Sequence, residues 1–167
     1  MRHKPHILLI NPWITGFAAY NFWIKPLGLL NVASLLRVNG FRVTFIDCLD
    51  FYSKRKKYGD GNFFKTWIEK PAPLKSIPRH FSQYGIPEEL LSEKLSSIEN
   101  PDVIGITSGM TYWYPGLFKI MEIVRRFFKE VPIILGGIYA TLCHEQPKDI
   151  PGPILLFGEE GNWKGQD

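Results

Sequence analysis

Cysteine is scarce in this chain of 167 residues, which contains only Cys48 and Cys143. No Cys-x-x-x-Cys-x-x-Cys triplet occurs, so the chain holds no iron–sulfur cluster through that motif. The two cysteines follow predicted strands that we expect to lie three strand spacings apart, about 14 Å, which is too far for a disulfide bond. We therefore expect two free thiols.

Long apolar runs are also missing. No stretch approaches the roughly 20 uninterrupted apolar residues that a membrane span needs, and the first residues lack the long apolar core of a signal peptide. We expect a cytoplasmic protein with no membrane contact. The length and the hydrophobic content of 45% fit a single domain over residues 1–167 with a sizeable core.

The net charge of +4 is unevenly distributed, because residues 51–86 carry +6 and the remainder −2. The same segment holds eight aromatic residues, which a disordered linker would not. We expect a packed insertion that folds as a lid over one edge of the domain. Its basic run at residues 54–57 would suit nucleic-acid phosphate, but a solvated loop is the commoner outcome, so nucleic acid is not expected as a partner.

Short apolar runs alternate with segments of helical period, a pattern typical of a parallel sheet covered on both faces. Helices are predicted to begin near Pro26, Pro87 and Pro115, and strands are predicted at residues 6–11, 41–47, 103–107, 133–135 and 154–157. The sequence predicts an α/β domain with a Rossmann-like, flavodoxin-like, doubly wound five-stranded parallel sheet in the order 2-1-3-4-5. The aromatic and basic insertion follows strand 2, and residues 159–167 are expected to be a frayed terminus or a truncated continuation.

Ligands of such sheets bind beyond the carboxyl ends of the strands, near the point where the strand order reverses, here between strands one and three. The candidate cofactor-binding residues are therefore those at the strand ends: Asn11, Pro12, Thr107, Ser108, Gly109, Met110, Gly136, Gly137, Ile138, Tyr139, Gly158 and Glu159. No catalytic pair and no metal-ligand set stands out. His144 is interpreted as a solvent-facing loop histidine.

Ser108-Gly109-Met110 and Gly136-Gly137, separated by a helix-length spacer, resemble the second and third signature blocks of cobalamin-binding domains. In that family the dimethylbenzimidazole tail of the cofactor is buried between these two strand ends, where glycine leaves room for a flat heterocycle. The resemblance implies that Ser108 hydrogen-bonds the tail. From the residues alone, a hydroxyl that only caps the following turn is an equal alternative.

The first block of that family, Asp-x-His-x-x-Gly, is absent, because residues 6–11 lead into Pro12-Trp13-Ile14. The stretch from Lys25 to Asp47 resembles the amino-terminal domain of cobalamin-dependent radical S-adenosylmethionine enzymes. The resemblance implies a cobalamin bound base-off without a histidine ligand from the protein. It also implies a radical S-adenosylmethionine catalytic domain, downstream or separate, that carries the iron–sulfur cluster. We expect no turnover from this chain alone.

Other classes of function remain to be weighed. A degenerate domain that keeps the fold without binding a corrinoid would serve in docking or substrate gating. A receiver domain needs acidic residues at the strand ends where this chain has Asn11 and Thr107. A dinucleotide site needs the motif Gly-x-Gly-x-x-Gly after the first strand, where this chain has Gly16 alone. A flavin held by the loop at Thr107 stays open. The aromatic residues 112–114 either wall the ligand or pack against the insertion.

Overall fold

The computed structural model describes residues 4–22, 25–50, 62–143 and 153–157. Its main sheet has five strands in the order β3-β1-β6-β7-β8, and every pairing is parallel. In chain order this arrangement is 2-1-3-4-5, so the predicted doubly wound, Rossmann-like topology is confirmed. The strands are β1 (His6–Asn11), β3 (Arg42–Asp47), β6 (Val103–Ser108), β7 (Ile133–Gly137) and β8 (Ile154–Phe157).

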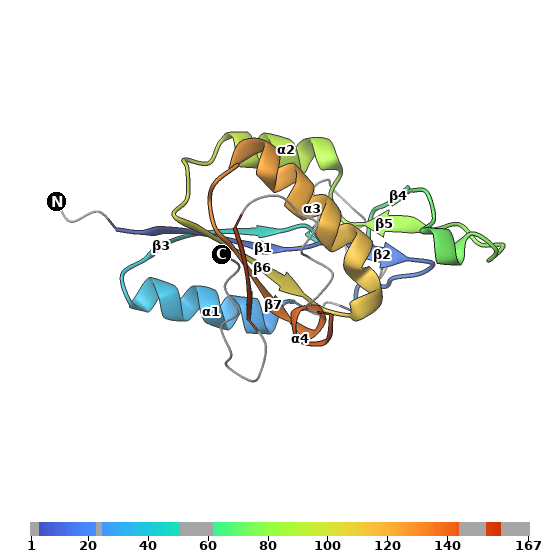
Figure 1. The fold of residues 1–167 in the computed structure, drawn as a ribbon, viewed down its shortest axis with the longest axis horizontal. Helices are drawn as coiled ribbons and strands as arrows, with labels where there is room; N and C mark the ends of the chain where they lie inside the picture. The colour runs from blue at the N-terminus through green and yellow to red at the C-terminus, as the bar shows by residue number, and fades with distance from the viewer. Residues whose placement is uncertain (1–3, 23–24, 51–61, 144–152, 158–167) are drawn as a thin grey trace.

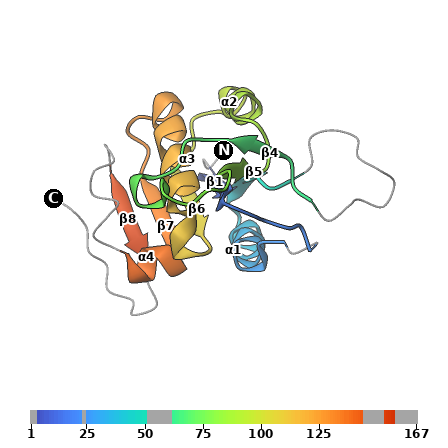
Figure 2. The same ribbon diagram turned by 90° about the vertical axis from the view of Figure 1, so that its right-hand side faces the viewer.

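Helices lie on both faces of this sheet (Figure 1), with α1 (Leu27–Val38) on one face and α2 (Glu88–Ser96) and α3 (Tyr114–Phe127) on the other. Each begins close to a proline, whose fixed φ suits a first helical turn. A short helix, α4 (Ile138–Leu142), follows β7 directly. Figure 2, turned by 90°, shows α4 beside β7 and β8, away from α1.

The two faces of the sheet are covered unequally. The face under α2 and α3 carries the larger core, in which Leu8, Ile104 and Ile133 are fully buried. On the opposite face α1 packs through Ala33 against Ile7 and Leu9. Alternate residues of a strand point to opposite faces, so Gly136 of β7 lies on the α1 face, and it is only half-buried there.

A second, antiparallel sheet extends the molecule beyond the carboxyl end of β1 (Figure 1). Its strands are β2 (Ile14–Gly16), β5 (Ser82–Tyr84) and β4 (Lys65–Trp67), in that order. The last two come from the predicted insertion at residues 51–86, whose Phe63, Phe81 and Tyr84 are buried. These strands were not predicted, because three residues are too few for a visible alternation. The basic run at 54–57 lies outside the described residues, and the lid stays a prediction.

Two strand ends differ from the sequence prediction. The strand predicted at 103–107 includes Ser108, and the strand predicted at 133–135 runs on through Gly136 and Gly137. Glycine keeps its backbone hydrogen-bonding groups, so β7 pairs with β6 to its last residue, with Thr107 beside Gly136 and Ser108 beside Gly137. The glycine pair therefore forms the end of the strand and does not follow it.

Both cysteines are free, as their predicted positions required. Cys48 is buried in the larger core, and burial raises the pKa of its thiol far above the ordinary range. A thiol in this environment stays protonated and is a poor nucleophile.

No helix among the described segments is long and apolar enough to cross a membrane.

His6, at the amino-terminal end of β1, is 3% exposed, and its Nε2 lies 2.8 Å from the hydroxyl of Thr44. Its Nδ1 is buried without a hydrogen-bond partner in the described part of the chain. Burial, and then the positive charge of Arg42, lower the pKa of the imidazole below its usual value of 6.5. The neutral ring is therefore the form that the fold accommodates.

We expect His6 to make folding less favourable in acid. Below pH 6.5 the unfolded chain takes up a proton that the folded chain accepts only at lower pH, so the free energy of unfolding falls as the pH falls through the lowered pKa. Urea unfolding at about pH 7.5 and pH 5.5 should show a smaller acid loss in His6→Gln than in the wild type. His80→Gln, at an exposed histidine, is the control. An equal acid loss in the wild type and His6→Gln would contradict the assignment.

Candidate functional site

The candidate site lies at the carboxyl ends of β6 and β7, where the resemblance placed it. Thr107 pairs with Gly136 and Ser108 with Gly137, so the two motifs, although far apart in the sequence, are neighbours in the sheet. Alternation along the strands divides them between the faces. Ser108 and Gly137 belong to the side of the larger core, and Thr107 and Gly136 belong to the α1 side. We call Thr107 and Gly136 the Gly136 platform.

The hydroxyl of Ser108 is fully used by the chain itself. It donates to the carbonyl oxygen of Gly136 at 2.8 Å and accepts from the backbone N–H groups of Tyr139 at 3.1 Å and Ala140 at 3.4 Å. Ser108 therefore caps the start of α4 across the sheet, not the turn that follows it in the sequence. Its single hydrogen would have to leave Gly136 before it could bond a ligand.

Two glycines of the motifs are required by contacts within the chain. Gly137 has φ +96, and a Cβ built on it would lie 2.2 Å from the carbonyl oxygen of Ser108. A Cβ on Gly109 would lie 2.5 Å from the indole ring of Trp113. Atoms of Ser108 and Trp113 therefore fill the space next to these two glycines. Packing within the chain explains both glycines, and no bound ligand is needed to account for them.

Gly136 is different, because a Cβ built on it would meet nothing within 4 Å. Its φ lies outside the left-handed region, so the backbone alone does not demand glycine there. The platform thus presents bare backbone with free space above it, at the edge where doubly wound folds bind ligands. Of the glycines in the two motifs, this one leaves room for a flat group.

An apolar rim follows the two strands. Met110 is 45% exposed, Tyr112 61% and Ile138 49%, and each comes shortly after the end of β6 or β7. Trp113 packs instead against the cluster of Ile14, Phe63 and Tyr84, which joins β2 to the insertion. Of the two alternatives for the aromatic residues 112–114, packing on the insertion therefore holds for Trp113, while Tyr112 is available to a ligand.

Tyr139, also a predicted binding residue, is buried, and its ring meets that of Phe118 edge-on at 5.9 Å. Burial raises the pKa of its phenol to about 12, so it stays protonated near neutral pH. Tyr139 anchors α4 to the core beneath the candidate site. Among the predicted residues, Gly158 and Glu159 lie outside the described residues, as does His144.

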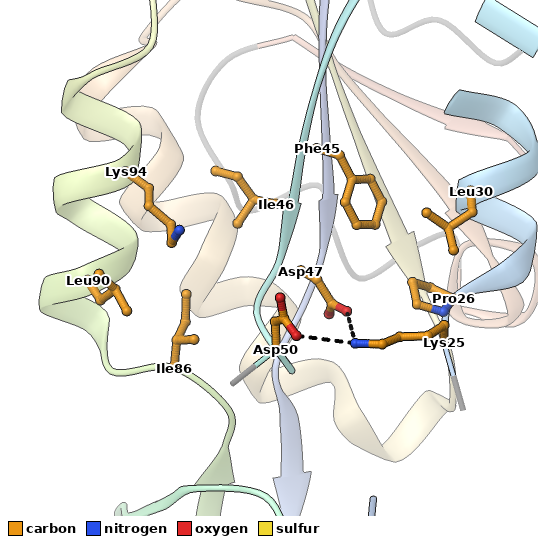
Figure 3. A pocket seen from close by; sticks show the side chains of 10 residues that line it. All are labelled: Lys25, Pro26, Leu30, Phe45, Ile46, Asp47, Asp50, Ile86, Leu90 and Lys94. Carbon is orange, nitrogen blue, oxygen red and sulfur yellow. Dashed lines mark hydrogen bonds and ion pairs between the residues drawn. The ribbon is translucent and has the colours of Figure 1, made fainter. Parts of the chain in front are cut away.

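The end of β1 is closed by polar contacts. Asn11 is buried and donates its side-chain amide to the carboxylate of Asp47 at 2.7 Å, and Pro12 beside it is buried as well. Lys25 lies 3.5 Å from Asp47 and 3.3 Å from Asp50, as Figure 3 shows. Asn11 thus links neighbouring strand ends, and only rearrangement would expose Asn11 and Pro12 to a ligand.

Sequence reasoning missed a groove of about 500 Å³ next to this cluster (Figure 3). It is lined by residues of β3, of the two helices beside it and of the adjoining loops: Lys25, Pro26, Leu30, Phe45, Ile46, Asp47, Asp50, Ile86, Leu90 and Lys94. Its residues come from three separate segments of the chain, so no single stretch of the sequence marks it. No group of three or more His, Cys, Asp or Glu side chains in the described segments is placed to hold a metal ion.

Comparison with known proteins yields a distant likeness. No family model matches the chain, and no curated protein matches it. Among solved structures, the radical S-adenosylmethionine methyltransferase TsrM from Kitasatospora setae, with cobalamin and a [4Fe-4S] cluster bound, is similar with a TM-score of 0.48 and 16% sequence identity. The match covers 82% of this chain and 20% of TsrM, so the chain spans a fifth of the length of that enzyme. A likeness this distant does not identify a ligand for the present chain.

Proposed function

We propose that this domain binds a corrinoid of the cobalamin type at the carboxyl edge of the main sheet, with the flat tail of the cofactor on the Gly136 platform. The observation that carries the proposal is the open position above Gly136, in a motif whose other glycines are filled by the chain's own atoms. A planar heterocycle needs bare backbone and free space, and both are present there.

The surroundings of the platform fit a large and mostly apolar cofactor. Met110, Tyr112 and Ile138, which follow the ends of β6 and β7 in the chain, are exposed, and such side chains would give a macrocycle broad contact at low entropic cost. The α1 face over β7 is less covered than the opposite face, so the tail would enter without displacing a core side chain.

Each residue of the site has a limited role in this proposal. Gly136 and Thr107 would carry the tail, while Ser108 would act as a positioning residue by holding the carbonyl of Gly136 and the start of α4. The described histidines lie elsewhere, His6 at the amino end of β1 and His80 beside β5, so we expect a base-off cofactor without a histidine ligand from the described residues.

A bound corrinoid supplies methyl-transfer or radical chemistry, and the residues of this chain would bind and orient it. The chain would then be the accessory part of a radical S-adenosylmethionine enzyme, whose cluster-bearing catalytic domain lies downstream or on a separate protein.

The test is a visible-absorption titration of the full chain with hydroxocobalamin. We expect saturable binding by the wild type and about tenfold or weaker affinity in Gly136→Val, because the branched side chain occupies the platform. The matched control is Gly16→Val, at a strand glycine outside the site whose added Cβ would find its nearest atom 3.9 Å away. Its affinity should stay unchanged.

The outcomes separate the alternatives. Undiminished binding by Gly136→Val would reject the platform, and no saturable binding by the wild type would reject a corrinoid and favour a docking or substrate-gating domain. Flavin mononucleotide titrated in parallel tests the flavin alternative. A spectrum of nitrogen-ligated cobalt that is lost in His144→Ala would contradict the ligand-free geometry.

A further inference from the structure

A stacked aromatic pair is exposed on the second sheet, in the part that extends beyond the main sheet (Figure 1). The indole of Trp67, the last residue of β4, lies parallel to the imidazole of His80, with 4.1 Å between the ring centroids and 4° between the planes. Trp67 is nevertheless 65% exposed, so the face of the indole that His80 does not cover is open to solvent. A flat ring of a ligand can stack on such a face.

A pocket of about 360 Å³ adjoins the pair, and both rings line it together with Glu69, Lys70 and Arg79. Its volume is at the lower end of the range of roughly 300–1,000 Å³ that small-molecule sites span. We call it the Trp67 pocket. Its size suits a ligand of one or two rings and not a corrin macrocycle.

Two cations of the pocket are held in place by uncharged partners. The ammonium of Lys70 donates to the carbonyl oxygen of Ile77 at 2.6 Å, and the guanidinium of Arg79 lies 5.7 Å from the centroid of the Phe17 ring. Neither contact neutralises the charge, and both restrict the side chain before a ligand arrives. An anion therefore meets cations that are already positioned.

The acidic group of the pocket does not cancel these charges, because the carboxylate of Glu69 is paired with Lys75 at 3.1 Å. Glu69 is also the single acid in residues 62–86, against four basic residues, so this segment carries a net charge of +3. Lys65 adds to it beside the stacked pair, since it is exposed and lies two residues before Trp67 on the same face of β4. The surroundings of the pocket thus favour an anionic ligand.

An open indole face and positioned cations together select a ligand that carries both a planar ring and a phosphate. A nucleotide has both groups. An acidic peptide would pair with the cations but would leave the indole face unused. A membrane surface needs several apolar side chains, whereas Trp67 is the one large hydrophobic residue that is exposed within residues 62–86.

We propose that the Trp67 pocket binds a nucleotide unit, either free or within a single strand of nucleic acid. The base stacks on the open face of Trp67, and the phosphate pairs with Arg79 and Lys70. The sequence argued against nucleic acid from the run at residues 54–57, which has no part in this site. The pocket shares no residue with the Gly136 platform, so either proposal can fail without the other.

The test titrates the full chain with two probes, ATP by calorimetry and an end-labelled oligoadenylate of about ten residues by fluorescence anisotropy. Saturable binding of ATP identifies a free nucleotide, and binding of the oligoadenylate alone identifies a single strand. Trp67→Ala should weaken binding about tenfold or more, because the stacked base loses its support, and Trp67→Phe should restore most of the affinity. Phe22→Ala is the matched control, since Phe22 is 67% exposed but lies outside the pocket.

Arg79→Gln should also weaken binding about tenfold. For the oligoadenylate it should reduce the slope of log affinity against log salt concentration by about 0.7, the contribution of one phosphate contact to a single strand. Arg126→Gln, at an exposed arginine of α3, should change neither quantity. Trp67 and Arg79 are both exposed, so neither substitution removes a core side chain.

The proposal is overturned if the wild type binds neither probe, or if Trp67→Ala binds as tightly as the wild type. Binding to phosphatidylserine vesicles that Trp67→Ala abolishes, without nucleotide binding, would assign the surface to a membrane instead. Hydroxocobalamin should bind wild type and Trp67→Ala equally well. A weaker affinity of the variant would place part of the corrinoid in this pocket and would overturn its assignment to a separate nucleotide.

Discussion

Replacing Gly137 with alanine is expected to destabilise the fold by about 3 kcal/mol. The added Cβ would lie 2.2 Å from the carbonyl oxygen of Ser108 and 3.0 Å from its backbone nitrogen, both of which belong to the paired strand and cannot move away cheaply. The residue also has φ +96, which costs an L side chain roughly 1–2 kcal/mol before any overlap is counted. Urea denaturation of the wild type and Gly137→Ala measures the effect.

Gly136→Ala is the matched control, because its Cβ meets nothing within 4 Å and its backbone needs no left-handed conformation. Its free energy of unfolding should remain within about 1 kcal/mol of the wild type. Equal stability losses at the two positions would contradict the division of the glycine pair into a packing position and an open platform. The corrinoid titration depends on this division, since a variant at Gly137 would test folding rather than binding.

Replacing Arg125 with alanine is expected to have a comparable effect, again about 3 kcal/mol. Arg125 is buried, and its guanidinium donates to the carbonyl oxygens of Phe128, Lys129, Val131 and Pro153. It thereby joins the end of α3 to the segment before β7 and to the residue before β8. Alanine would leave these carbonyls with fewer partners and a cavity among them, which thermal or urea unfolding would record.

Arg126→Ala supplies the control, because Arg126 follows on the same helix but is exposed. Its substitution should change the stability by about 0.5 kcal/mol or less. Arg125→Lys keeps the charge but loses the planar fork that serves several carbonyls at once, so an intermediate loss is expected. If Arg125→Ala were as stable as Arg126→Ala, the guanidinium would not link α3 to the sheet.

The main architecture could be predicted because its signals are local. The apolar run of β1, the helix that follows Pro26 and the apolar stripe of α3 each carry their pattern within a few turns of the chain, and the parallel order follows from their alternation. The strands β2, β4 and β5 could not be predicted in this way. Each has three residues: β4 and β5 pair with each other within the insertion, and β2 forms where the segment after β1 meets β5.

The placement of the two motifs at neighbouring strand ends was predictable, but the contacts of their residues were not. Spacing placed Ser108 and Gly136 at neighbouring strand ends, and the pairing of Thr107 with Gly136 is consistent with that placement. The occupation of the Ser108 hydroxyl by Gly136 and α4 left no trace in the sequence, since its partners lie 28 to 32 residues away. The groove along β3 left no trace in the sequence either, because the position of β3 at the edge is a property of the whole sheet.

The sequence by itself determined the layered fold and the strand order, because hydrophobic period and turn residues act over short distances. The tertiary structure decided what each residue of the motifs does there. Only the three-dimensional neighbours show that Gly109 and Gly137 are filled by Trp113 and Ser108 while Gly136 stays open. The space around a glycine is set by residues distant in the chain, and no local pattern encodes it.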